Sequence, residues 1–353
     1  MADVTPAGRE AVEDAARSAQ GASSLVMPLF ANTGFVPFLR NLLCSLDRLR
    51  VESWFVIALD NATCGLLGEQ VGPQRCVHPY SSTADSSSGQ VQSYGSFGFY
   101  WIAMQRPLWL RWLLERGHAV LNCDLDIVWL HDPRPHLSRG RLEQADMLFQ
   151  TDSGHGLNGG FYVARPSSRT LGFFAAWLAD LAAKAAARAG FEEQHSLNRA
   201  LRTKGKALQL RWAGLNESRF PNGKLWWSRS YGSKAEAFIV HCNWVKSNKK
   251  GRLRRDNLWF LDEHDARCQP GFDPFEDGCD RQCVPVRYCA PGESCTPVRS
   301  CAELRGWHPR ALEAANCSAA TAAQLTAGLP LRRAAARHRG LSERAWDDSC
   351  RHR

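Results

Sequence analysis

Two aspartates stand two residues apart at the end of an apolar run. The segment 121–133 reads LNCDLDIVWLHDP, and its Asp124 and Asp126 follow the mostly apolar residues 118–123, which predict a short buried strand. In a strand, residues i and i+2 point to the same side, so both carboxylates should project together. Two such charges repel each other unless a cation lies between them. The pair therefore predicts a site for Mn²⁺ or Mg²⁺, hard ions that prefer oxygen ligands.

A polar turn is the alternative for this pair, because aspartate at a strand end is ordinary turn chemistry. The position favours a ligand site, since open α/β sheets bind ligands at the carboxyl ends of their strands. His241 ends a second apolar run, FIVHC, and would complete a metal site with positions left for phosphate oxygens. A core histidine without a ligand is the alternative for this residue.

A paired glycine follows another predicted strand end, in the segment GLNGGF (156–161). Gly159 and Gly160 carry no side chains, so a ligand could approach the backbone closely. Asn158 offers both a donor and an acceptor. The segment predicts a contact with a substrate, and a strand with a bulge is the alternative.

A carboxylate and an amide begin a predicted helix in the segment EEQHSLN (192–198). Glu193 and Gln194 either stabilise the helix start or face a sugar. Asp152 and Asn32 each stand at the end of a predicted strand or directly after it. Both are further candidates for contacts with a donor or acceptor.

A basic segment, KSNKKGRLRR (246–255), holds six positive charges and no negative one. It predicts a binding site for a diphosphate, with Lys250 as the first candidate and Arg106 as the next, and a solvated loop is the alternative. The formal net charge of +9 permits anionic partners, including nucleic acid. We expect no nucleic acid, because Trp244 and Trp259 near this segment lie in apolar runs typical of a core.

The elements that must position these residues follow an α/β pattern. Strands at 24–31 and 53–60, with an amphipathic helix between them, form a β-α-β opening typical of a parallel sheet. Two helices, 96–105 and 106–117, should precede the aspartates, with Pro107 in the first turn of the second. Further strands are predicted at 145–152, 156–166, 206–212 and 237–242, and further helices at 170–190 and 192–202.

Cysteines are concentrated near the C-terminal end, where eight of the 13 lie between residues 268 and 350. A dense, even set in Pro- and Gly-rich sequence predicts disulfides formed in an oxidising compartment. A zinc module would need Cys-x₂-Cys pairs or interleaved histidines. The predicted domains are an N-terminal tail (1–23), an α/β domain (24–265) and a small disulfide-rich module (266–353).

Three Asn-x-Ser/Thr sequons, at Asn61, Asn216 and Asn316, agree with a secretory route. The chain shows neither a signal peptide nor a stretch of 18 apolar residues. We therefore expect a protein of the Golgi lumen or secretory pathway that meets the membrane only through an anchor absent from this chain.

Four blocks of the sequence resemble a known family. GHAVLNCDLDIVWLHDP, LNGGFYVARPS, RFPNGKLWW and IVHCNWVKSNKKGRLRRDNLWFLD occur in the order found in nucleotide-diphospho-sugar transferases. This family includes plant extensin arabinosyltransferases and rhamnogalacturonan xylosyltransferases, and the resemblance covers residues 24–263. It implies a GT-A fold, in which a mixed sheet is flanked by helices, and a retaining glycosyl transfer that depends on a metal.

The resemblance also implies roles for individual residues. It supports Asp124 and Asp126 as ligands of the metal and the diphosphate, and His241 as the late histidine of related retaining families. Residues 158–160 match the donor-sugar block, and Lys250 matches the final lysine of the last block. It further implies a Golgi enzyme with a single N-terminal anchor.

The chain departs from the family pattern at three places. Relatives often have Asp-Gln where this chain has Glu193 and Gln194, and the longer side chain of Glu193 changes where the carboxylate can lie. Relatives usually have asparagine at the position of Cys242 and glycine at that of Ser247.

The resulting hypothesis is a metal-dependent retaining glycosyltransferase that moves a sugar from a nucleotide diphosphate, expected to be a UDP-sugar, to a glycan or glycoprotein. Glu193 is the predicted nucleophile. Two alternatives are a secreted carbohydrate-binding protein without activity and a basic nucleic-acid-binding protein.

Overall fold

The computed structural model describes residues 4–21, 24–81, 97–154, 156–186, 193–228, 231, 234–271, 274, 287–288 and 296–297. The chain divides into two compact units. The first comprises residues 1–253 with 259–270, and the second comprises 254–258 with 271–353. Within the second unit, β10 (Arg287–Tyr288) pairs antiparallel with β11 (Thr296–Pro297). The candidate site residues all belong to the first unit, so the fold of that unit is what positions them.

The first unit opens with the predicted β-α-β arrangement. Strand β1 (Met27–Ala31) pairs in parallel with β2 (Trp54–Ala58), which pairs in parallel with β3 (Cys76–Val77). Helix α2 (Val36–Arg48) connects the first two strands and buries its leucine face against them. This confirms the parallel sheet expected from the alternation of apolar runs.

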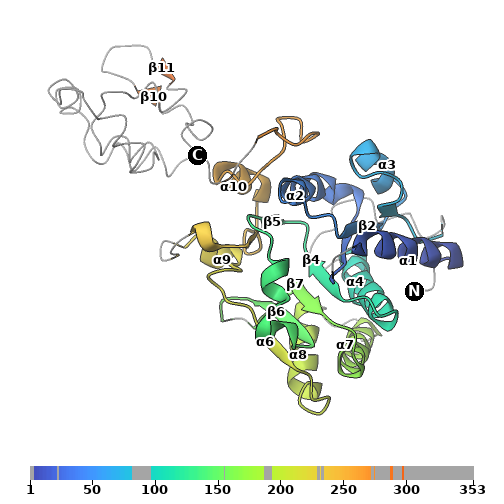
Figure 1. Cartoon of the computed structure of the whole chain (residues 1–353). Helices are drawn as coiled ribbons and strands as arrows, with labels where there is room; N and C mark the ends of the chain where they lie inside the picture. Colours follow the sequence, from blue (N-terminus) through green and yellow to red (C-terminus); the bar gives the residue numbers. More distant parts are fainter. Residues whose placement is uncertain are drawn as a thin grey trace. The chain divides into compact units, whose positions relative to one another are not determined.

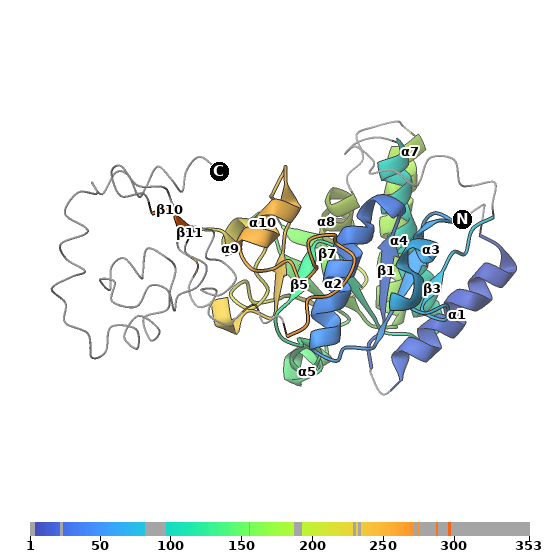
Figure 2. The same ribbon diagram turned by 90° about the horizontal axis from the view of Figure 1, so that it is seen from above.

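Helices cover this sheet on both faces. Side chains alternate along β1, so that Val26 and Phe30 join one core, while Met27 and Leu29 join the other. Helix α2 lines the second core, and helices α1 (Pro6–Gln20) and α4 (Phe97–Glu115) line the first. Figure 2 shows α2 on one side of β1, and α1 and α4 on the other. This layering is the predicted α/β architecture.

The N-terminal segment, predicted as a tail, forms helix α1. Thr5 caps it by accepting a hydrogen bond from the Gly8 backbone N–H at 2.9 Å. Val12 and Ala16 are fully buried against the sheet. A Cβ on Gly8 would lie 2.3 Å from the Pro79 carbonyl oxygen, so the helix lies close to the chain after β3. Helix α1 is therefore part of the first unit.

A mixed sheet follows, in the order β4-β7-β6-β8. Strand β4 (Val120–Cys123) and strand β6 (Met147–Thr151) each pair antiparallel with β7 (Leu157–Ala164), and β6 pairs in parallel with β8 (Trp212–Gly214). The bridge between Val26 and Val120 connects β4 to the first sheet. Figure 1 shows β4, β7 and β6 side by side at the centre of the unit.

A short antiparallel pair completes the scaffold of the site. Strand β5 (Ile127–Trp129) follows the two aspartates and pairs with β9 (Ile239–His241), so that Ile127 lies opposite His241. The other helices among the described residues are α3 (Thr63–Leu67), α5 (Arg134–Leu137), α6 (Gly140–Glu143), α7 (Ser168–Ala186), α8 (Glu193–Lys204), α9 (Gly223–Trp226) and α10 (Lys249–Arg255). The 3₁₀ helices in this part of the chain are η1 (Thr33–Phe35), η2 (Gly68–Gln70) and η4 (Lys234–Glu236).

Two predicted elements differ from the structure. The two helices predicted before the aspartates form one helix, α4, with Pro107 in its interior. An interior proline costs about 3 kcal/mol, and the burial of Trp109, Leu110 and Leu113 in the core offsets this cost. The strand predicted at 206–212 is reduced to β8, because the preceding residues form turns that end helix α8.

Asp146 lies at the junction of β6 with β8. It is 3% exposed and accepts hydrogen bonds from Arg169 Nε at 2.7 Å and from the Arg211 backbone N–H at 2.9 Å. Burial raises the pKa of this carboxyl, but the two arginines outweigh burial and hold the pKa well below its usual range. The charged carboxylate therefore stabilises this junction.

Two disulfides join parts of the first unit. Cys64 pairs with Cys76, and Cys44 of α2 pairs with Cys268. Cys268, which the predicted boundary at residue 266 assigns to the C-terminal module, lies in the first unit and pairs there with a cysteine of α2. The other seven, Cys279, Cys283, Cys289, Cys295, Cys301, Cys317 and Cys350, lie outside the described residues. Their pairing and the three domain boundaries stay predictions.

Among the described residues, no helix is both long enough and apolar enough to span a lipid bilayer.

Candidate active site

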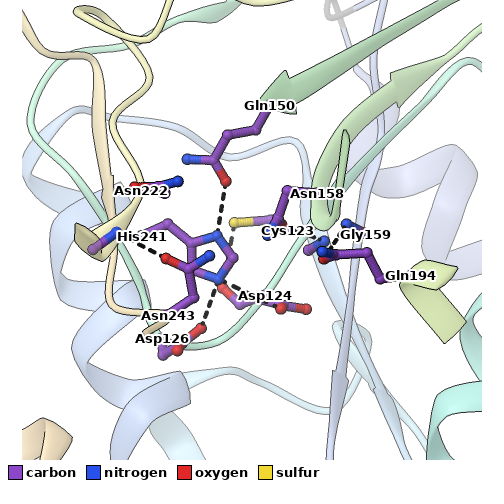
Figure 3. Close-up of polar contacts among 12 residues, drawn as sticks. Cys123, Asp124, Asp126, Gln150, Asn158, Gly159, Gln194, Asn222, His241 and Asn243 are labelled. Atoms are coloured by element: carbon purple, nitrogen blue, oxygen red, sulfur yellow. Dashed lines mark hydrogen bonds and ion pairs between the residues drawn. The ribbon is translucent and has the colours of Figure 1, made fainter. Parts of the chain in front are cut away.

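The three predicted metal ligands lie together. Asp124 and Asp126 occupy the turn between β4 and β5, and the pairing of β5 with β9 brings His241 beside them. His241 Nε2 lies 3.2 Å from Asp126 Oδ1 and 3.6 Å from Asp124 Oδ2. One ligand atom from each residue lies within 4.8 Å of the others (Figure 3). Residues 117 positions apart in the sequence thus form one compact group that has the donor set of a divalent metal site.

A glutamine absent from the sequence prediction orients the histidine. Gln150 of β6 donates from Nε2 to the carbonyl oxygens of Phe220 and Pro221, each at 3.1 Å. Its Oε1 therefore accepts from His241 Nδ1, at 2.8 Å (Figure 3). With Nδ1 as the donor, neutral His241 presents a lone pair on Nε2 to a metal. The signal in the sequence was a polar residue inside the apolar strand DMLFQT.

Opposite charges set the protonation of this group. Burial raises the pKa of Asp126, but Lys249 and His241 outweigh burial and hold it well below its usual range. Arg106 and His241 likewise lower the pKa of Asp124 against the effect of burial. Burial lowers the pKa of His241, but the two aspartates raise it to about 9. His241 must release a proton to bind a metal, so metal binding and proton release are coupled.

The glycine pair lies against these ligands, with its two members facing opposite ways. A Cβ on Gly160 would lie 2.2 Å from Asp124 Oδ2 and 2.7 Å from His241 Cε1. A Cβ on Gly159 would lie 3.6 Å from Gln194 Cβ, an ordinary contact. Asn158 Oδ1 accepts from the Gly160 backbone N–H at 2.7 Å. The absence of a side chain at Gly160 therefore makes room for two of the predicted metal ligands, Asp124 and His241, and the contact of the glycine pair with a donor sugar stays a prediction.

Arg106 joins the metal ligands to the predicted nucleophile. Its guanidinium forms ion pairs with Asp124 and with Glu193. Arg106 was expected at the start of the second of two helices, but it lies inside the single helix α4 and reaches across to the start of α8. Burial raises the pKa of Glu193 to about 7, although Arg106 lowers it. Among the described residues, Glu193 Oε1 has no hydrogen-bond partner.

Gln194 and Asp152 belong to one buried network. Gln194 accepts from the Gly159 backbone N–H at 3.1 Å and donates to Asp152 Oδ2 at 3.0 Å. Asp152 Oδ1 accepts from Asn222 at 3.0 Å and from Asn243 at 3.2 Å. The two asparagines were not predicted, because each becomes meaningful only when the fold brings it to Asp152.

The basic segment contributes a different lysine from the one predicted. Lys249 begins helix α10 and places Nζ 2.6 Å from Asp126 Oδ2. Lys250 pairs instead with Asp265. Successive residues of a helix point about 100° apart, so only one of two neighbouring lysines can face the aspartates. The lysine beside Asp126 is therefore Lys249, and the contact of Lys250 with a diphosphate stays a prediction.

Asn32 is buried directly after β1 and precedes η1. Asp60, which follows β2, accepts from the Thr33 backbone N–H at 2.7 Å and from the Thr33 hydroxyl at 3.0 Å. The carboxyl ends of β1 and β2 are therefore held together, and Asn32 lies at this sheet edge as predicted. Its contact with a donor stays a prediction.

Comparison with known proteins identifies the family. The model of the family described as nucleotide-diphospho-sugar transferase matches residues 49–255, more than half of the chain. The chain belongs to this family. It is therefore a glycosyltransferase, which confirms the enzyme class predicted from the ordered blocks.

The chain is similar to several individual proteins. The chain is 28% identical over 252 residues to the UDP-D-xylose:L-fucose alpha-1,3-D-xylosyltransferase MGP4 of Arabidopsis thaliana, covering 65% of this chain and 68% of that protein. It is 27% identical over 261 residues to the beta-arabinofuranosyltransferase RAY1 of the same plant, covering 67% and 47%. Among solved structures, the galactosyltransferase LgtC matches with a TM-score of 0.41 at 10% identity, covering 62% of this chain and 86% of that one.

Proposed function

We propose that this glycosyltransferase is metal-dependent and retaining, and that it transfers a sugar from a UDP-sugar to a glycan or glycoprotein. The observation that supports the proposal is the group of Asp124, Asp126 and His241, whose ligand atoms lie within 4.8 Å of one another. Relatives named as UDP-xylose transferases support UDP-xylose as the first donor to test.

The residues fit a divalent ion, Mn²⁺ or Mg²⁺. Two carboxylates and one imidazole supply oxygen and nitrogen ligands, and Gln150 holds the imidazole in the tautomer that a metal needs. Gly160 keeps the space beside Asp124 clear of a side chain. When bound, the ion would neutralise negative charge on the leaving diphosphate.

Lys249 and Arg106 would also stabilise the negative charge on the leaving diphosphate. Lys249 contacts Asp126, so its ammonium can reach a diphosphate bound beside that aspartate. Arg106 lies between Asp124 and Glu193, where it would hold the donor and orient the Glu193 carboxylate. Both side chains are fixed before the substrate arrives, which favours electrostatic stabilisation of the transition state.

Glu193 is the proposed nucleophile. Retention needs either a carboxylate nucleophile or an attack on the same face guided by the leaving phosphate. In the first route, Glu193 Oε1 bonds to the anomeric carbon as the bond to the diphosphate breaks. An acceptor hydroxyl then displaces the Glu193 carboxylate and gives its proton to the released diphosphate. The buried Oε1, without a hydrogen-bond partner among the described residues, supports this route.

We also propose that the enzyme works in the Golgi lumen. The disulfides Cys44–Cys268 and Cys64–Cys76 support this location, because disulfides persist in oxidising compartments and are rare in the cytosol.

Release of UDP from UDP-xylose, UDP-arabinofuranose and UDP-galactose would test the proposal, measured with Mn²⁺ and with excess chelator. Transfer to methyl α-L-fucoside would test the acceptor, and NMR of the product would give its anomeric configuration. Asp126→Asn should abolish Mn²⁺-dependent turnover and leave the melting temperature within a few degrees of the wild type. Turnover in excess chelator would refute the metal dependence, and an inverted product would refute retention.

A further inference from the structure

An exposed tryptophan follows the metal-binding histidine. Trp244 stands three residues after His241, and 44% of it is exposed. Its φ of 63° is a left-handed backbone conformation that is costly for a bulky residue and that recurs at ligand sites. The apolar run around this tryptophan predicted a place in the core, so its exposure needs a physical explanation.

A buried carboxylate fixes the orientation of this ring. Trp244 Nε1 donates to Asp152 Oδ1 at 2.7 Å, and Asp152 is only 4% exposed. The other oxygen, Asp152 Oδ2, accepts from Gln194 at 3.0 Å. Asp152 thus lies between Gln194 and Trp244, so the ring is two hydrogen bonds away from Gln194, the residue that follows the proposed nucleophile Glu193.

The surroundings of the ring suit a neutral sugar. The face of an indole is apolar and electron-rich, so it attracts the C–H groups on one side of a pyranose, while the hydroxyls stay at the rim. Lys224 is exposed, and its Nζ lies over the Trp244 ring at 5.2 Å from the centroid, which is a cation–π contact. The flexible side chain can move aside for a sugar and place its ammonium against a hydroxyl at the rim.

We propose that Trp244 is the floor of an acceptor subsite that binds a neutral sugar residue of the glycan by stacking, with Lys224 at its rim. This inference rests on the proposed function, because it needs a donor sugar beside Gln194. A surface that binds only a protein partner would not require the indole to be held by the same carboxylate that holds Gln194. The subsite explains why an exposed tryptophan is anchored to a buried aspartate.

Two substitutions of Trp244 separate stacking from anchoring. Trp244→Ala removes both the ring and the hydrogen bond to Asp152, whereas Trp244→Phe keeps an aromatic face and removes only the hydrogen bond. Trp212, which is 45% exposed and begins β8, provides the matched control Trp212→Ala. Each protein is assayed with UDP-xylose for hydrolysis alone and for transfer to methyl α-L-fucoside.

The ratio of transfer to hydrolysis is the decisive quantity. Trp244→Ala should lower this ratio at least about tenfold and raise KM for the fucoside, because the loss of an aromatic contact falls on acceptor binding. Trp244→Phe should stay within about threefold of the wild type, and Trp212→Ala should match the wild type. These results together would support the subsite.

Other results would overturn it. An unchanged ratio in Trp244→Ala, or equal losses in Trp244→Phe and Trp244→Ala, would refute stacking and leave the proposed function standing. If the wild type releases no UDP from any donor of the panel, the proposed function fails and the subsite fails with it.

Discussion

Replacing Gly160 by alanine tests the metal site through a single methyl group. The added Cβ would lie 2.2 Å from Asp124 Oδ2, whereas ordinary contacts begin at 3.4 Å. The carboxylate oxygen must therefore move by about 1.2 Å, the difference between these distances. Metal–ligand distances tolerate changes of about 0.2 Å, so Asp124 cannot remain a ligand in its present position.

The expected loss of metal affinity follows from this displacement. Changes in residues that only support a ligand typically cost 10- to 100-fold in metal affinity, so the loss of a ligand should cost at least about 100-fold, or about 2.7 kcal/mol. The Cβ would also meet His241 Cε1, at 2.7 Å, which adds to the effect. Gly160→Ala should therefore raise the Kd for Mn²⁺ by at least about 100-fold.

The neighbouring glycine provides the control. Gly159→Ala adds the same methyl group on the opposite face of β7, in ordinary contact with Gln194. Its Kd for Mn²⁺ should stay within about twofold of the wild type. Calorimetric titration of both variants with Mn²⁺, after their melting temperatures are compared, measures the difference. Wild-type affinity in Gly160→Ala would refute the assignment of Asp124 and His241 as metal ligands.

Three further predictions concern charged side chains. Lys249→Ala should lower kcat/KM for the nucleotide sugar by about 10²-fold in steady-state kinetics, whereas Lys250→Ala should lower it less than tenfold. Equal losses in the two variants would contradict the placement of the two lysines. Glu193→Gln should lower kcat at least about 10³-fold, and activity retained in this variant would exclude Glu193 as the nucleophile. In the wild type, kcat should fall as the pH drops below about 7, because the Glu193 carboxylate then takes up a proton. The lowered pKa of Asp146 means that its contribution to stability is present above the unfolded-state pKa of about 4 and is lost as pH falls toward the folded-state pKa. Asp146→Asn should lower the free energy of unfolding by about 2 kcal/mol at pH 7 and by less at pH 3, as measured in urea, and an equal loss at both pH values would contradict this reasoning.

Much of the scaffold was predictable because its signals are local. The apolar runs that became β1, β2, β4 and β7 each lie between turn residues, and their order predicted the parallel opening. The continuous helix α4 was not predictable in this way, because a proline normally begins or ends a helix. Only the burial of the residues after Pro107 in a core built by distant elements makes the unbroken helix stable.

The candidate site was predictable where chemistry coincides with a strand end. Asp124 and Asp126 follow a strand and His241 ends one, so the α/β pattern favoured a ligand site at these positions, and the resemblance to the family supported it. The partners that orient this group were not predictable, since the contact between Gln150 and His241 joins positions 91 residues apart. The sequence also could not predict whether Lys249 or Lys250 lies beside Asp126, because this depends on where helix α10 begins.

The disulfide between Cys44 and Cys268 has a consequence for how the enzyme is made. Its cysteines are 224 positions apart, whereas Cys64 and Cys76 are separated by 12. During synthesis the Cys64–Cys76 disulfide can form early, but Cys44 cannot form its disulfide until Cys268 has emerged from the ribosome. A gene shortened to residue 255, where the family match ends, would never supply its partner. Recombinant versions should therefore run at least to residue 268 and be produced where oxidation can follow translation.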